Sequence, residues 1–64
     1  MLRIRELRQE RHLSQEQLAR IADVTTKTIA RAETDGSVTV RTLRRIAEAL
    51  GVPVAELFEP EEPA

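Results

Sequence analysis

The chain has 64 residues, of which 41% are hydrophobic and 33% charged, with two glycines and three prolines. This length allows one domain, and the composition is typical of a small helical protein rather than a disordered one. The absence of cysteine and the single histidine, His12, exclude disulfide scaffolds, thiolate chemistry and a multi-histidine zinc site. Gly36 and Gly51 cannot form a phosphate-binding loop. We therefore expect no enzyme activity, no metal and no cofactor.

The net charge of −1 argues at first against a nucleic-acid partner. However, residues 56–64 contain four glutamates and no Lys or Arg, so the first 55 residues carry 10 basic and 7 acidic side chains, a balance of +3. We expect a domain over residues 1–58 and a disordered, acidic, Pro-rich tail over 59–64. The sequence lacks a signal peptide and any apolar run of about 20 residues, which predicts a cytoplasmic protein without a membrane partner.

The hydrophobic spacing predicts an all-α fold of five helices and no strand. The first spans residues 2–11, and the second spans 15–22 after a capping box formed by Ser14 and Gln17. Asp23 provides a tight joint, because Asp tolerates left-handed backbone geometry, and Thr25 caps a third helix that ends at Glu33.

Thr34 to Ser37 form a loop in which Gly36 supplies a positive φ. The fourth helix begins after Thr39 and ends before Gly51, with one apolar stripe. A fifth, very short helix is expected to have Pro53 in its first turn and to carry Val54, Leu57 and Phe58.

Residues 15–33 have the spacing of a helix-turn-helix motif. Two short helices are separated by a joint of about three residues, and the small Ala19 allows them to cross closely. The third helix presents Thr26, Lys27 and Arg31 on its outer face. Lys and Arg side chains there can donate to guanine acceptors in the major groove of DNA, and Thr can contact a thymine methyl.

Three motifs carry a resemblance to a known family: L-S-Q-x-x-L-A at Leu13 to Ala19, T-I-x-R-x-E at Thr28 to Glu33, and T-L-x-x-I-A-x-A-L-G-V at Thr42 to Val52. With this spacing, residues 4–58 resemble the lambda-repressor-like, Cro/XRE-type helix-turn-helix DNA-binding domain. The resemblance implies a compact five-helix domain that binds double-stranded DNA and regulates transcription, most simply as a repressor.

The resemblance also implies roles for individual residues. Base contacts fall to Thr26, Lys27 and Arg31. Another group of residues is expected either to contact the DNA backbone or to brace the side chains that contact bases: Gln15, Thr25, Thr28, Ser37 and Arg41. Arg8 and Glu33 match a brace between the first helix and the recognition helix, and dimerisation through the end of the domain matches Val54, Leu57 and Phe58.

The chain departs from the family pattern at three positions. Asp23 and His12 stand where glycine is usual, and Ala32 stands where a large apolar residue is usual. The first two changes are expected to affect stability, at a cost of roughly 1 kcal/mol for Asp23. The small Ala32 is expected to leave the core loosely packed next to the recognition helix.

Several alternatives remain open from the sequence alone. Arg8 and Glu33 could form an ordinary surface pair, and Lys27 and Arg31 could belong to a solvated helix face. Leu57 and Phe58 could close the core instead of meeting a second copy. At the level of function, the alternatives are an antitoxin that binds its own promoter and a toxin partner, or a protein-interaction module that keeps the fold without binding DNA.

Overall fold

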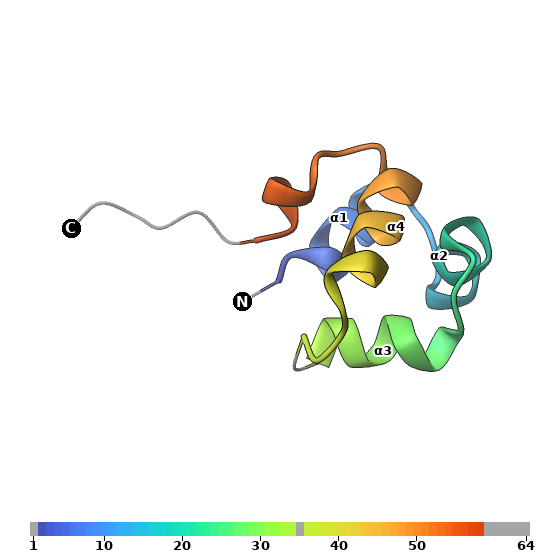
Figure 1. Cartoon of the computed structure of the whole chain (residues 1–64). Helices are drawn as coiled ribbons and strands as arrows, with labels where there is room; N and C mark the ends of the chain where they lie inside the picture. Colours follow the sequence, from blue (N-terminus) through green and yellow to red (C-terminus); the bar gives the residue numbers. More distant parts are fainter. Residues whose placement is uncertain (1, 35, 59–64) are drawn as a thin grey trace.

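The computed structural model describes residues 2–34 and 36–58, and these form an all-helical bundle (Figure 1). The α-helices are α1 (Ile4–Glu10), α2 (Gln15–Ala22), α3 (Thr26–Thr34) and α4 (Val40–Leu50), followed by the short 3-10 helix η1 (Val54–Leu57). α2 packs against both α3 and α4, while α1 also contacts these two helices. The tail expected over 59–64 lies outside the described residues.

Local side-chain chemistry explains where these helices begin. The Gln17 backbone N–H donates to Ser14 Oγ at 3.0 Å and the Ser14 N–H donates to Gln17 Oε1 at 2.7 Å, which completes the expected capping box of α2. Thr39 caps α4 by accepting from the Thr42 N–H at 3.2 Å. The start of each helix is therefore determined by a capping side chain and the residue three positions after it.

The helix ends depend on left-handed backbone geometry. Asp23 ends α2 with φ 58° and Gly51 ends α4 with φ 73°, and each cap N–H is bonded to carbonyls of the preceding turn. His12 has φ 56°, which confirms that the chain breaks there between α1 and α2. Gly36 has φ 70°, the positive angle expected for the loop before α4.

A single apolar core lies between the helices. Its largest fully buried side chains come from all four α-helices and from η1: Ile4, Leu18, Ile29, Ile46 and Leu57. Burying one such side chain contributes about 1.5–3 kcal/mol to folding. The core therefore holds α3 by one face and leaves its opposite face to solvent.

The expectation of five helices was wrong, because the described residues contain four α-helices and one 3-10 turn. Pro53 lies outside η1 with ψ 152°, and Phe58 returns to an extended conformation with ψ 143°. Only four residues remain between them, which is too short for a run of α-helical hydrogen bonds. Phe58 instead forms an isolated antiparallel bridge with Leu2, so α1 begins at Ile4 rather than at residue 2.

Candidate nucleic-acid interface

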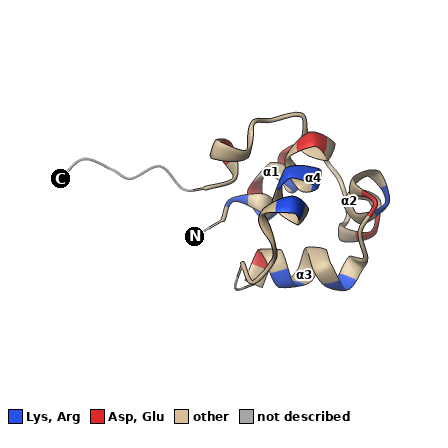
Figure 2. Cartoon of the chain, in the orientation of Figure 1, with Lys and Arg blue, Asp and Glu red and all other residues tan. Residues whose placement is uncertain are grey.

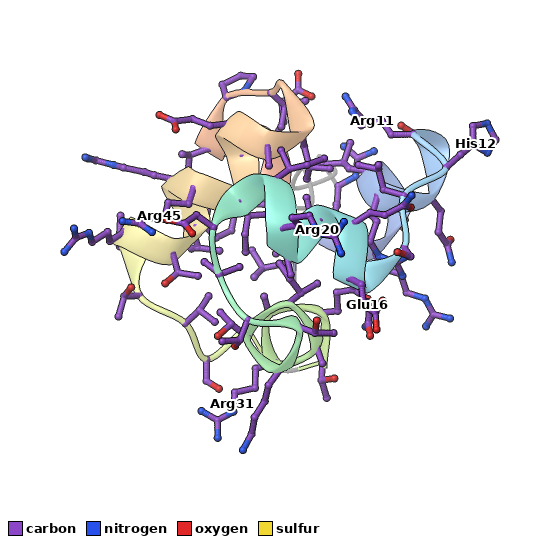
Figure 3. All side chains as sticks on the ribbon, turned by 90° about the vertical axis from the view of Figure 1, so that its right-hand side faces the viewer. Arg11, His12, Glu16, Arg20, Arg31 and Arg45 are labelled. Carbon is purple, nitrogen blue, oxygen red and sulfur yellow. The ribbon has the colours of Figure 1, made fainter. Side chains whose placement is uncertain are left out.

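α3 presents a polar and basic surface opposite its buried face. Ile29 and Ala32 are 0% and 1% exposed in the core, whereas Thr26, Lys27 and Arg31 are all exposed. Figure 3 shows Arg31 projecting away from the body of the protein below α3. The structure therefore brings the three residues predicted to contact bases onto one accessible helix.

The electrostatics of this surface are set by which charges of α3 are neutralised. Its charged residues are Lys27, Arg31 and Glu33 (Figure 2). Glu33 faces inward, with a side chain only 6% exposed. None of the ion pairs found among the described residues involves Lys27 or Arg31. The outer face of α3 is therefore positive although the chain as a whole is not.

An internal ion pair joins α3 to α1. Arg8 Nε donates to Glu33 Oε2 at 2.8 Å and Arg8 Nη2 donates to Glu33 Oε1 at 3.4 Å. The Arg8 side chain is 13% exposed, so the pair is largely shielded from water. This geometry corresponds to the brace rather than to the surface pair that the sequence left open, and breaking a buried pair costs about 3–5 kcal/mol.

The residues predicted to contact the DNA backbone include two threonines at the start of α3, a serine in the loop before α4 and an arginine in the first turn of α4. The Thr28 N–H donates to Thr25 Oγ1 at 3.1 Å, and the two hydroxyl oxygens lie 2.8 Å apart, so Thr25 caps α3. Ser37 is exposed in the loop, and Arg41 is exposed in the first turn of α4. Thr25, Ser37 and Arg41 are therefore exposed, whereas Thr28 is half-buried.

Two further interactions were not anticipated from the sequence. Gln15 Nε2 donates to Glu33 Oε1 at 3.2 Å, and Arg45 Nη1 donates to the Asp23 carbonyl at 3.2 Å. Arg45 Nη1 also lies 3.5 Å from the exposed Asp23 carboxylate, so α4 contacts the turn of the motif. The partners are 18 and 22 residues apart, and no local pattern in the sequence signals either contact.

The three residues predicted at a dimer interface have different environments. Leu57 is 0% exposed and belongs to the core, so it is removed from the candidate interface. Val54 is half-buried against the core, whereas Phe58 is 47% exposed. Phe58 borders a hollow of about 240 Å³ that is also lined by Leu2, Ala32, Glu33, Thr34, Gly36 and Leu43. Ala32 is itself buried in the core and lies at the edge of this hollow.

The family model that matches this chain is that of the helix-turn-helix proteins, over residues 4–57. The chain belongs to the Cro/C1-type helix-turn-helix family. This family consists of DNA-binding transcription regulators rather than enzymes, as the sequence predicted. No curated protein matches the chain.

Solved structures of helix-turn-helix proteins are also similar to it. The restriction-modification controller protein C.AhdI from Aeromonas hydrophila is 33% identical, with a TM-score of 0.83 over 88% of this chain and 86% of the controller. The N-terminal DNA-binding domain of the biofilm regulator SinR from Bacillus subtilis is 26% identical, with a TM-score of 0.79 and complete coverage of both chains. A hypothetical transcription factor from Neisseria is 27% identical, with a TM-score of 0.77 over 84% of this chain and 62% of that one.

Within the described residues, none of the helices has the length and hydropathy needed to cross a membrane. No group of three acidic or histidine side chains gathers there as a metal site.

Proposed function

We propose that this helix-turn-helix protein binds specific sequences of double-stranded DNA by placing α3 in the major groove. The observation that carries the proposal is the exposed row of Thr26, Lys27 and Arg31 on a helix whose opposite face is fixed in the core. Lys27 and Arg31 are one helical turn apart, so both side chains reach the same groove. Their N–H groups donate to guanine O6 and N7, and Thr26 lies beside them.

Contacts to the DNA backbone position α3 in this proposal. Gln15, Thr25, Thr28, Ser37 and Arg41 supply hydrogen bonds or charge to phosphates, in agreement with their half-buried or exposed positions around the motif. Such contacts fix the register of a protein on DNA but carry little sequence information. Sequence preference then depends mainly on Lys27 and Arg31.

Selection of bound duplexes from a random pool tests this proposal directly and identifies the preferred sequence. In Arg31→Ala, we expect affinity for that sequence to fall about 5- to 150-fold, with relaxed preference at one base position. The matched control is Arg11→Ala, which removes the same charge at the end of the molecule far from Arg31 (Figure 3). If Arg31→Ala bound selected and unrelated duplexes as the parent does, the assignment of Arg31 would be wrong.

The proposed regulatory effect is repression, because occupation of a promoter by a DNA-bound domain is sufficient to exclude a polymerase. Transcription in vitro from a promoter that overlaps the selected sequence should decrease as the protein is added. A promoter with the sequence scrambled serves as the control. Increased transcription from the intact promoter would identify an activator and contradict repression.

A further inference from the structure

The side-chain amide of Gln15 forms a hydrogen bond with a largely buried carboxylate. Its Nε2 donates to Glu33 Oε1 at 3.2 Å, and the Glu33 side chain is 6% exposed. Gln15 itself is only partly buried and is the first residue of α2. One side of the amide therefore contacts a shielded carboxylate while the residue retains access to solvent.

The carboxylate that accepts this bond is itself fixed. Arg8 donates to both Glu33 oxygens, through Nε at 2.8 Å and Nη2 at 3.4 Å. The third Arg8 nitrogen, Nη1, donates to the Leu13 carbonyl at 2.7 Å, two residues before Gln15. These bonds join α1, the α1–α2 connection, the start of α2 and the end of α3, so Glu33 cannot turn away from Gln15 without breaking the network.

A carboxylate at Glu33 determines which way the Gln15 amide faces. An ionised carboxylate only accepts hydrogen bonds, so the amide nitrogen rather than the amide oxygen must point toward it. The nitrogen has two hydrogens, and Glu33 Oε1 takes one of them. A DNA phosphate also only accepts, and therefore needs the second N–H. The orientation imposed by Glu33 is the one that provides this hydrogen.

We propose that Glu33 is a positioning residue for DNA binding, which holds the Gln15 amide so that its remaining N–H donates to a phosphate. This inference rests on the proposed function, because it assumes that the surface around α3 binds duplex DNA. It assigns the Arg8–Glu33 pair a role in affinity as well as in stability. An amide oriented before binding loses less conformational freedom when DNA arrives, which is worth about 2- to 10-fold in affinity.

A double-mutant cycle on the selected duplex separates this role from a purely structural one. The variant Arg8→Met/Glu33→Leu removes the acceptor of Gln15 but preserves net charge. Apolar replacement of a buried ion pair is often neutral or stabilising, so we expect the variant to retain its core. We expect it to bind the duplex about 2- to 10-fold more weakly than the parent.

The second arm of the cycle makes the same two changes in a Gln15→Ala background. There they should have no further effect on affinity, because the amide that Glu33 positions is already absent. Gln9→Ala, which removes an exposed amide from α1, should bind as the parent does.

Equal losses from Arg8→Met/Glu33→Leu with and without Gln15 would show that Glu33 acts only through folding and would overturn the inference while leaving the proposed function intact. Failure of the parent to bind any duplex would instead overturn the proposed function, and this inference with it. A measurement on the parent alone covers the case in which the variant does not fold. The side-chain amide protons of Gln15 should exchange with water more slowly than those of Gln9 by NMR, and equal exchange would contradict the positioning.

Discussion

His12 and Asp23 hold backbone angles that most L-amino acids avoid, with φ of 56° and 58°. Both positions are joints on either side of α2, where the family pattern has glycine. A left-handed angle costs an L-residue about 1–2 kcal/mol, and Asp tolerates it better than His because its short side chain bonds locally. Asp23 also gains the contacts from Arg45 to its carbonyl and carboxylate. The two joints therefore differ in how much strain they retain.

His12→Gly should raise the free energy of unfolding by about 1 kcal/mol, because glycine removes the strain at an exposed site. Asp23→Gly should give a smaller gain, since the change also removes the carboxylate near Arg45. Urea denaturation of the parent and of both variants measures these differences. A larger gain at Asp23 than at His12 would contradict this ranking of strain.

At the scale of the element, the position of α3 depends on how completely the core fills the space beneath it. Ala32 is 1% exposed and borders the hollow of about 240 Å³ next to Phe58. Near Ala32, Ile29 and the Arg8–Glu33 pair attach the inner face of the helix to the rest of the protein. The helix is thus fixed by Ile29 and Glu33, and the small side chain of Ala32 between them borders the hollow.

Ala32→Leu should stabilise the protein by about 1 kcal/mol, because the added carbons enter the hollow and are removed from water. The matched control is Ala47→Leu, the same change at a position 2% exposed within the core of α4. It should destabilise the fold by about 1–3 kcal/mol through overpacking. Thermal unfolding of the two variants checks the contrast, and a loss of stability in Ala32→Leu would show that the hollow does not accept a side chain from residue 32.

At the scale of the whole molecule, the small positive balance of the first 55 residues limits non-specific attraction to DNA. One recognition helix makes few base contacts, and two-fold dimers gain specificity by contacting two half-sites about one helical turn apart. We therefore propose a homodimer on DNA, with Phe58 and the hollow that it borders beside Leu2 as the contact. The exposed aromatic ring of Phe58 is an apolar group that a second copy would cover.

Phe58→Ser should weaken self-association and lower affinity for a two-half-site duplex more than for a single half-site, while leaving the fold intact. Ile21→Ser is the control, because Ile21 is also an exposed apolar residue, at 56% against 47% for Phe58, and lies on α2. Leu57→Ala should instead cost about 2–5 kcal/mol of stability, since Leu57 lies in the core. Sedimentation with and without DNA gives the oligomeric state, and an unchanged dimer in Phe58→Ser would remove this surface from the proposal.

The sequence by itself determined the features that depend on neighbouring residues. The caps formed by Ser14, Thr25 and Thr39 depend on residues within three positions of one another, which is why α2, α3 and α4 begin where they were predicted. The three motifs also indicated the family, and the resemblance to that family implied the pairing of Arg8 with Glu33 across 25 residues. The tertiary structure alone decided the features that need distant segments to meet. It buried Leu57 but left Phe58 exposed, and it joined Gln15 to Glu33 and Arg45 to Asp23. The physical reason is that a side chain's burial and its long-range hydrogen bonds depend on how whole elements pack, whereas helix ends depend on the nearest few side chains.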